Sequence, residues 1–411
     1  MVDVEYDLEK VQLIESSNPY VRFAGLLPLT RPLDRLPEAT YTPMIHAKRL
    51  GRELGMDSLY LKNETALPTK TTKDRMAAVS LAYLRERGVH SFCASSTGNS
   101  GTAFAYGIRA HPDMHVFLFT AERFVPRVQY ADHPQVTHFG MRDASFVEAA
   151  NYGSGYAKQH GLVSESGFFN PARREGLKLA FLEATEQVPQ PIDWYVQAVS
   201  SAMGVYGAYK GAKELRQMNR LQKLPRLLCV QQETCAPMAR AFHERSEVIK
   251  DKHLVPRPSG IAEAILRGDP SRAYPHVLRI VLESCGGFAI VSESEIRSAR
   301  PRVEDTEGIS ICFSAAAAVA GLMQRTREDA SLRNSVVVVN LTGGDRPDPT
   351  LLNDVEWVER TSQGWALQPP ETDYAAPLWC RLPVFYACCA VAAGAQPAHA
   401  MGSAEAAAAA P

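Results

Sequence analysis

From about residue 57 to residue 342, short apolar runs alternate with longer amphipathic stretches, and this alternation constrains the fold more than any other feature of the chain. It is typical of α/β proteins, in which helices join largely parallel strands. The apolar runs predict strands at residues 58–62, 91–94, 115–119, 194–199, 226–231, 288–291 and 335–341. The amphipathic stretches predict helices at residues 74–87, 100–110, 145–160, 173–185, 205–218, 237–245, 274–284, 293–302 and 314–326. We therefore expect mostly parallel sheets flanked by helices, with a site at the carboxyl ends of the strands.

The Pro-Gln-Pro segment at 189–191 predicts a boundary between two α/β domains. The expected parts are an N-terminal arm at 1–46, a first domain at 47–188, a second domain at 189–350 and a C-terminal extension at 351–411. Part of the extension is expected to pack, because it carries Trp357, Trp365 and Trp379. From residue 390 onward the chain is mostly alanine without an apolar face, which favours a loose tail.

Composition excludes several classes of function. The chain has 411 residues and a formal net charge of -1, so nothing attracts it globally to nucleic acid or to a membrane surface. No apolar run reaches membrane-spanning length, and the acidic N-terminus has no apolar signal core. The 8 cysteines form no C-x-x-C pair, which favours free thiols in a reducing, cytoplasmic compartment. The 11 histidines form no cluster, and we expect no metal.

The segment 68–75, Pro-Thr-Lys-Thr-Thr-Lys-Asp-Arg, places Lys73 at the start of a predicted helix. A lysine that forms a Schiff base with a cofactor must be fixed in position and must still reach the α-proton of the substrate. The start of a helix after a turn containing Pro68 offers that rigidity. Taken alone, however, such a lysine would be interpreted as a solvated side chain beside its charged neighbours.

A loop of small polar residues follows the strand predicted at 91–94 and precedes an apolar helix. Its candidate substrate-binding residues are Ser96, Thr97, Gly98 and Ser100. Small residues there expose backbone N–H groups at a helix N-terminus, which suits a substrate carboxylate. The Asn99 amide could form a hydrogen bond with a cofactor ring hydroxyl. A plain glycine turn with a capping serine explains the loop equally well.

Two further loops follow predicted strands. The first consists of Ser200, Ser201, Ala202, Met203 and Gly204. Two hydroxyls, a glycine and a helix N-terminus can hold a phosphate there, although a tight turn between a strand and a helix looks the same. In the second loop, Thr342 and two glycines end the strand predicted at 335–341, and the threonine hydroxyl could contact a pyridine nitrogen.

The lysine and the substrate loop together suggest a pyridoxal-phosphate site, which would perform carbanion chemistry on an amino acid. In their order, the motifs resemble the fold type II pyridoxal-phosphate family, specifically its threonine synthase branch. The resemblance covers roughly residues 18–349 without large gaps. It rests on Asn-Pro-Tyr-Val-Arg-Phe at 18–23, Thr-Pro-Met at 42–44, Leu-Lys-Asn-Glu at 61–64, Lys-Asp-Arg at 73–75, Asn-Pro at 170–171, Glu-Gly at 175–176, Gly-Asp-Pro at 268–270 and Thr-Gly at 342–343.

This resemblance implies a cofactor, pyridoxal 5′-phosphate, bound in the cleft between two α/β domains. It implies that Lys73 is the Schiff-base lysine, that Asn99 is the ring-hydroxyl partner, that residues 200–204 bind the cofactor phosphate and that Thr342 faces the pyridine nitrogen. The implied activity is that of a lyase of amino-acid biosynthesis, which removes phosphate from O-phosphohomoserine by γ-elimination and adds water at the β-carbon. The implied partner is an amino-acid substrate, and a homodimer is compatible with the sequence.

Departures from the family pattern fall at the site. Lys70 stands where the family usually has Gly, Thr72 where it usually has Phe, and Met203 replaces a frequent Gly of the phosphate loop. We expect Lys70 to help bind a substrate with an anionic leaving group, although a solvent-facing turn lysine is equally compatible. Lys62 is interpreted as a contact to such a group or as an exposed residue at a strand end. The Arg-Arg pair at 173–174 either faces the substrate or is the solvated first turn of a helix.

Other functions remain open at this point. One alternative is β-replacement on phosphoserine or acetylserine, as in cysteine or cysteate synthases. Another is a specialised biosynthetic enzyme that joins a different nucleophile to a homoserine-type skeleton. A third is an inactive homologue that acts as a partner or regulator, but intact Lys73, Asn99 and Thr342 argue against it.

Overall fold

The computed structural model describes residues 1–34, 36, 39–346 and 355–368. Its strands are β1 (Met44–His46), β2 (Leu59–Asn63), β3 (Ser91–Ser95), β4 (His115–Ala121), β5 (Val136–Met141), β6 (Val163–Ser164), β7 (Trp194–Ala198), β8 (Arg226–Gln232), β9 (Gly287–Val291), β10 (Val337–Leu341), β11 (Val355–Thr361) and β12 (Gly364–Leu367). Its α-helices are α1 (Pro19–Arg22), α2 (Lys48–Leu54), α3 (Lys73–Arg85), α4 (Asn99–Gly107), α5 (Phe146–Gln159), α6 (Pro171–Gln187), α7 (Met203–Gln217), α8 (Pro237–His243), α9 (Tyr274–Glu283), α10 (Glu293–Glu307) and α11 (Phe313–Glu328). The predicted strands and helices are all confirmed, with ends that shift by a few residues.

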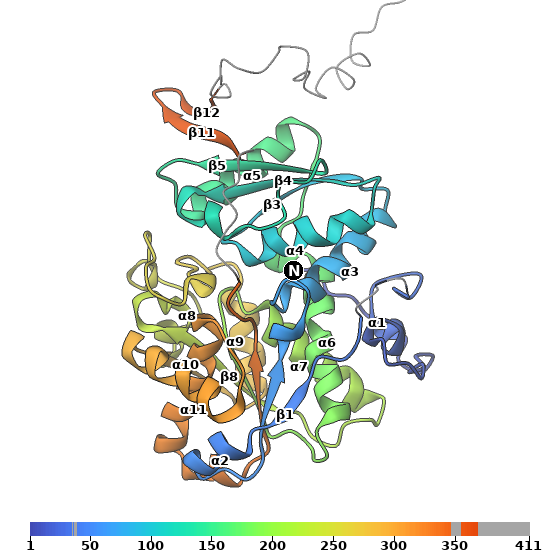
Figure 1. Ribbon diagram of the computed structural model, residues 1–411, viewed down its shortest axis with the longest axis vertical. Coiled ribbons are helices and arrows are strands. Elements are labelled where there is room, and N and C mark those ends of the chain that lie inside the picture. The colour runs from blue at the N-terminus through green and yellow to red at the C-terminus, as the bar shows by residue number, and fades with distance from the viewer. Residues whose placement is uncertain (35, 37–38, 347–354, 369–411) are drawn as a thin grey trace, which may run out of the picture. The chain divides into compact units, whose positions relative to one another are not determined.

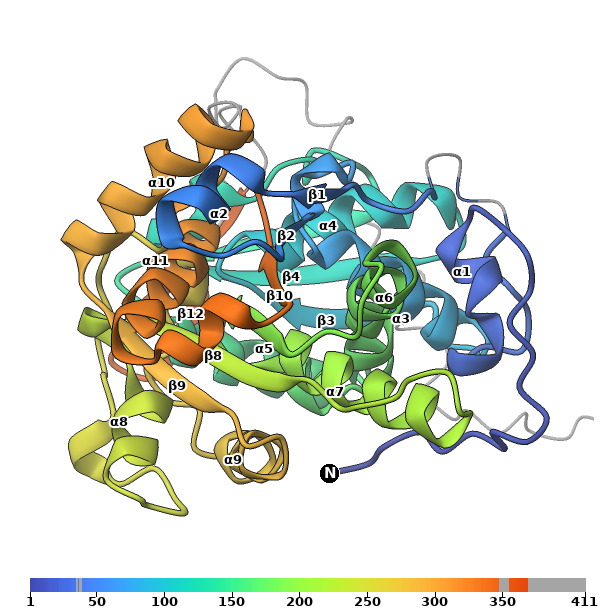
Figure 2. The ribbon, with the colours of Figure 1, turned by 90° about the horizontal axis from the view of Figure 1, so that it is seen from below.

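The first sheet has the strand order β1-β2-β10-β7-β8-β9, and its strands are parallel except for β1. Helices cover both faces, so successive residues of one strand enter different apolar clusters. In β10, Val337 and Val339 pack with residues of α10 and α11, whereas Val338 packs with residues of α7, α8 and α9. Figure 2 shows this layering around β8 and β9. The strand is buried along its whole length and mostly apolar because neither of its faces meets solvent.

The second sheet has the order β12-β11-β5-β4-β3-β6, and only its β11–β12 pair is antiparallel. Val116 and Leu118 of β4 pack with residues of α3 and α4, whereas Phe119 packs with residues of α5. Figure 1 shows β3, β4 and β5 side by side, with β11 next to β5. This sheet is therefore also mostly parallel and covered by helices on both faces.

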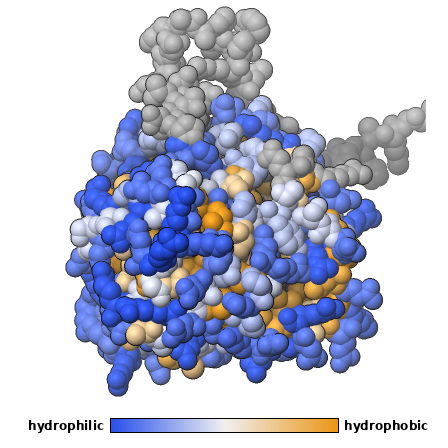
Figure 3. Space-filling model, turned by 60° about the horizontal axis from the view of Figure 1, so that its bottom comes forward, coloured by the Kyte–Doolittle hydropathy of each residue, from blue (hydrophilic) through white to orange (hydrophobic). Residues whose placement is uncertain are grey.

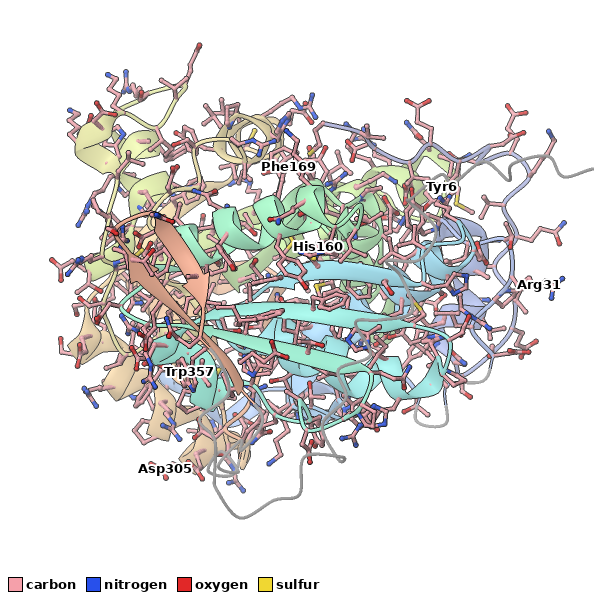
Figure 4. All side chains as sticks on the ribbon, turned by 90° about the horizontal axis from the view of Figure 1, so that it is seen from above. Tyr6, Arg31, His160, Phe169, Asp305 and Trp357 are labelled. Carbon is pink, nitrogen blue, oxygen red and sulfur yellow. The ribbon has the colours of Figure 1, made fainter. Side chains whose placement is uncertain are left out.

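Five strands were not predicted from the sequence, namely β1, β5, β6, β11 and β12. The parallel pairing of β11 with β5 places Trp357, labelled in Figure 4, opposite Gly140. A Cβ atom on residue 140 would lie 2.7 Å from the Trp357 ring, so only glycine leaves room for that ring. Trp365 packs against the same sheet, which confirms that part of the C-terminal extension packs. Trp379 and the alanine-rich tail lie outside the described residues.

The division of strands between the sheets differs from the expected domain boundaries at 188/189 and 350/351. β2 lies in the first sheet beside β10, although it precedes the whole second sheet in the chain. β11 and β12 extend the second sheet, although they follow β10. Residues Met1–Gln368 form one compact unit. The four-part division of the chain stays a prediction.

Hydrophilic side chains cover most of the face shown in Figure 3, with smaller apolar areas between them. None of the helices in the described part of the chain is long and apolar enough to cross a membrane.

Candidate active site

A cavity between the two sheets brings together loops that follow β3, β7 and β10. It is lined by Thr71, Thr72, Lys73, Ser95, Ser96, Thr97, Asn99, Ser100, Phe146, Gly167, Phe168, Arg173, Gln197, Ala198, Val199, Ser200, Ser201, Ala202, Met203, Gly204, Ala264, Ile265, Leu266, Arg267, Cys312, Ser314 and Thr342. The candidate residues Lys73, Asn99, Thr342 and those of the phosphate loop therefore share one cavity. Carboxyl ends of parallel strands are the usual position of sites in α/β folds.

The loop before Lys73 is joined to the end of β10 by backbone hydrogen bonds. Thr72 donates its N–H to the carbonyl oxygen of Thr342, and Gly344 donates its N–H to that of Lys70, each at 2.9 Å. Asp74 accepts hydrogen bonds from the Thr69 N–H (2.7 Å) and hydroxyl (2.5 Å). These bonds fix the start of α3 relative to the strand end, and with it the position of Lys73.

A buried ion cluster holds α3 against β2 and α6. Arg75 pairs with Glu64 at 2.7 Å and with Glu183 at 2.5 Å, and Lys62 pairs with Glu183 at 2.6 Å. All four side chains are buried, and their two positive and two negative charges balance. Both interpretations of Lys62 were therefore wrong. It is neither exposed nor in the cavity, because the carboxylate of Glu183, distant in the chain, compensates its burial.

The Lys73 amine has no hydrogen-bond acceptor and no carboxylate at ion-pair distance within the described residues. Burial, together with the nearby positive charge of Arg173, lowers its pKa from 10.5 to about 8. At neutral pH roughly one tenth of such amines are unprotonated, which is far more than for a solvated lysine. An amine with this property can act as a nucleophile and as a proton acceptor.

The loop before α4 is shaped by Ser96 and Gly98. The Ser96 hydroxyl oxygen accepts the N–H groups of Gly98 (2.9 Å) and Gly101 (2.8 Å), so those two donors serve the loop itself. Gly98 has a φ of 120°, and a Cβ atom there would lie 2.7 Å from the Arg127 side chain. Gly98 does not line the cavity. The N–H groups of Thr97, Asn99 and Ser100 have no acceptor in the described part of the chain and are available to an anion.

The loop after β7 has the properties of an anion site. In the described structure, no acceptor is found for the N–H groups of residues 200–204, which lie at the N-terminus of the 15-residue helix α7. Ala202 adopts the left-handed conformation with a φ of 63°. A Cβ atom on Gly204 would lie 2.3 Å from the Gln197 amide, so any larger residue there would displace the Gln197 side chain. The loop thus presents several unpaired donors and the positive end of a helix dipole to the cavity.

Thr342 and a group of polar residues lie beneath the cavity. No hydrogen-bond partner is found for the Thr342 hydroxyl within the described residues. Next to it in β10, the buried Asn340 donates hydrogen bonds to Tyr195 (2.8 Å) and to Gln197 (3.0 Å). Gln197 also lines the cavity. Asn340 and Gln197 were not identified from the sequence, because a polar residue inside an apolar strand has no local pattern that shows its role.

Two arginines face the cavity. Arg173 is buried, and it pairs with Glu165 and donates a hydrogen bond to the Ser100 hydroxyl at 3.3 Å. The interpretation of residues 173–174 as a solvated turn was therefore wrong. Arg267 was not identified from the sequence. Its Nε is buried without an acceptor, and burial lowers its pKa.

Lys70 lies outside the cavity lining, and its side chain is exposed. Its backbone has a φ of 54°, a left-handed conformation that favours glycine. The pyridoxal-phosphate family that this chain resembles usually has glycine at this position, and the left-handed conformation gives a physical reason for it. A role for Lys70 in substrate binding stays a prediction. In the described residues, no group of three or more His, Cys, Asp and Glu side chains is placed to hold a metal ion.

Comparison with known proteins agrees with the fold. Residues 36–343 match the family described as "Pyridoxal-phosphate dependent enzyme". The chain is 28% identical over 367 residues to threonine synthase of Methanosarcina acetivorans, which covers 86% of this chain and 88% of that protein. It is 27% identical over 315 residues to cysteate synthase of the same organism, which covers 72% and 76% respectively.

The structure is similar to that of maize serine racemase, with a TM-score of 0.62, 19% sequence identity and coverage of 75% of this chain and 89% of that one. At this identity the likeness concerns the fold alone. The family match extends over most of the chain and includes every strand of the first sheet. The chain therefore belongs to the fold type II family of pyridoxal-phosphate-dependent enzymes.

Proposed function

We propose that this enzyme acts on an O-phosphorylated amino acid of the homoserine type, from which it eliminates phosphate and to which it adds water, as a threonine synthase does. The observation that carries this proposal is the pair of arginines, Arg173 and Arg267, in the same cavity as Lys73. Burial lowers the pKa of Arg267, and the nearby positive charge of Arg173 acts in the same direction. Arg173 is already paired with Glu165, whereas an anionic substrate group beside Arg267 would compensate the charge of Arg267.

The residues of the cavity fit pyridoxal phosphate. The unpaired N–H groups of residues 200–204 would hold its phosphate, and the free hydroxyl of Thr342 would contact its ring nitrogen. Asn99 would contact the ring hydroxyl, and the Lys73 amine would attach the cofactor covalently. When bound, the cofactor withdraws electrons from the substrate α-carbon and so makes its proton acidic.

Lys73 would then move protons at the substrate carbons. Its low pKa suits a group that accepts a proton at one step and returns it at another near neutral pH. The free N–H groups of Thr97, Asn99 and Ser100 would bind the α-carboxylate. Ser96 would support this loop from within, since its hydroxyl oxygen already accepts two N–H groups.

The phosphate of the substrate would lie between Arg173 and Arg267. Glu165 and Ser100 use only part of the Arg173 guanidinium. Arg267 makes no ion pair with a described carboxylate, and its ring contact is with Phe146 at 5.4 Å. A guanidinium with free donors is suited to a phosphate, which accepts bidentate hydrogen bonds.

β-Replacement on phosphoserine is the second candidate. It is favoured by the similarity to cysteate synthases, which is about as strong as that to threonine synthases. Both candidates need a phosphate subsite, and they differ in the length of the substrate and in the incoming nucleophile. Phosphohomoserine has one more methylene group than phosphoserine, and water rather than sulfite is added.

The test is a substrate screen of the purified holoenzyme. Phosphate release would be measured with O-phosphohomoserine and with O-phosphoserine, the latter with and without sulfite, and acetate release with O-acetylserine. Mass spectrometry would identify the amino-acid product. We expect phosphate release from O-phosphohomoserine together with threonine. Cysteate formed from O-phosphoserine and sulfite would select the second candidate, and activity with O-acetylserine alone would refute both.

Two arginine variants test the phosphate subsite directly. Arg267→Leu should raise KM for the phosphorylated substrate by roughly 10- to 100-fold, the loss expected for hydrogen bonds between charged groups. Arg272→Leu is the matched control, because Arg272 is exposed and stacks on Phe169 (labelled in Figure 4) outside this cavity. Equal effects of the two changes would contradict a specific role for Arg267.

The five described cysteines are free thiols, which supports the cytoplasm as the proposed compartment. A homodimer stays a prediction.

A further inference from the structure

Arg346 lies against Asn99 but does not line the cavity. Its Nη2 donates hydrogen bonds to Asn99 Oδ1 at 2.7 Å and to the carbonyl oxygen of Arg127 at 3.2 Å. Its Nη1 is buried without an acceptor in the described part of the chain. Burial, with the charge of Arg127, lowers the Arg346 pKa to about 10. A half-buried cation that makes no ion pair with a described carboxylate, and whose Nη1 has no acceptor, is costly, so its position calls for a functional reason.

The contact determines which end of the Asn99 carboxamide is free. A guanidinium has only donors, so the atom of Asn99 beside it must be the carbonyl oxygen. The amino group, Nδ2, is then the end that remains for a ligand, and Asn99 lines the cavity. Without a donor at Oδ1, the carboxamide could turn over and present its oxygen instead.

We propose that Arg346 is a positioning residue, which holds Asn99 so that Nδ2 donates a hydrogen bond to the ring hydroxyl oxygen of bound pyridoxal phosphate. This inference rests on the proposed contact between Asn99 and that hydroxyl. A donor there stabilises the oxygen in its deprotonated form, whereas the carbonyl oxygen of a turned carboxamide would repel it. The positive charge of Arg346 acts in the same direction.

Cofactor affinity tests the proposal without any measurement of turnover. Cofactor-free protein would be titrated with pyridoxal phosphate and with 3-deoxypyridoxal phosphate, which lacks the ring hydroxyl. Arg346→Met should reduce the preference for pyridoxal phosphate by roughly 3- to 10-fold, as expected for one hydrogen bond, and should leave affinity for the analogue unchanged. Arg346→Lys keeps a donor and a charge and should retain most of the preference.

Asn99→Ala provides the matched comparison. It should lose the preference to the same extent as Arg346→Met, and the double variant should lose no more than either, because both changes remove one interaction. Equal weakening of both ligands by Arg346→Met would indicate a merely structural role and would overturn the proposal.

The outcomes separate this inference from the proposed function. If Asn99→Ala keeps the preference, the proposed contact of Asn99 is wrong. If Asn99→Ala loses the preference for pyridoxal phosphate over its 3-deoxy analogue and Arg346→Met keeps that preference, only the proposed role of Arg346 is wrong. Should Arg346→Met not fold, a crystal structure of the wild-type holoenzyme decides, and an Arg346 beyond hydrogen-bond distance of Asn99 overturns the inference.

Discussion

Replacing Lys73 with methionine should stabilise the cofactor-free protein at neutral pH and at the same time abolish turnover. Lys73 is held in the cavity without a carboxylate at ion-pair distance among the described residues, and its pKa falls from 10.5 to about 8. The protonated side chain is therefore less favourable in the folded protein than in the unfolded chain. Methionine has a similar length and carries no charge.

The magnitude follows from the pKa. A fall from 10.5 to about 8 corresponds to a cost of about 3 kcal/mol for the protonated amine in the folded state. Below pH 8 both states are protonated and the whole cost is present. Between pH 8 and 10.5 only the unfolded chain keeps the proton, so wild-type stability rises with pH and the cost disappears. The advantage of Lys73→Met should be about 3 kcal/mol near pH 7 and only about 1 kcal/mol near pH 9.5.

Urea unfolding of the cofactor-free wild type and variant at about pH 7 and 9.5 measures this difference. Lys70→Met is the control, because Lys70 is exposed and the chemical change is the same. It should show no pH-dependent gain. Borohydride reduction of the holoenzyme followed by peptide mass spectrometry should find the cofactor on Lys73. A Lys73→Met variant whose stability advantage is the same at both pH values, or absent, would refute the reasoning, and cofactor mass on another lysine would refute the assignment.

The remaining predictions concern Thr342, the phosphate loop and Lys70. Thr342→Ala should lower kcat more than cofactor affinity, because one neutral hydrogen bond contributes about 0.5–1.5 kcal/mol, and a crystal structure of the holoenzyme with this hydroxyl far from the ring would contradict it. The double change Ser200→Ala and Ser201→Ala should weaken cofactor binding in a titration, and unchanged affinity would mean that the phosphate is held elsewhere. Lys70→Gly should raise Tm relative to Lys70→Ala by the equivalent of about 1 kcal/mol, since only glycine relieves the left-handed backbone. If Lys70 contacts substrate, both Lys70 changes should raise KM for a phosphorylated substrate, more at low salt; an unmoved KM would remove Lys70 from the site.

The sequence predicted the elements that carry a local signal. The strand that became β10 is a run of valines, and the helix that became α3 begins within one residue of the predicted start, so both were found. β5 was missed because His138 and Gly140 interrupt its apolar pattern. Gly140 is explained only by Trp357, which lies opposite it in a strand more than 200 residues away. Pairings over such distances leave no mark in a local stretch of sequence.

The candidate site shows the same limit. Residues such as Lys73 could be found because they belong to motifs that follow one another in a recognisable order along the chain. The structure brings Lys73 and the phosphate loop into one cavity. Lys62 was misinterpreted because it lies in β2, whereas its partner, Glu183, lies in the distant helix α6. Arg267 and Arg346 were missed because an isolated arginine after a loop has no pattern. Their significance depends on what surrounds them in space, namely burial without a counter-charge.

The place of β10 between β2 and β7 has a consequence for biosynthesis. A nascent chain on the ribosome holds both neighbouring strands long before it holds the one that joins them. Until Leu341 has emerged, β2 and β7 each expose an unpaired edge, which is a site for association with other chains. Thr342 follows directly, so the last strand of this sheet and the last residue of the candidate cofactor site arrive together. A transcript truncated upstream of this point would therefore yield an aggregation-prone fragment rather than a partly active enzyme.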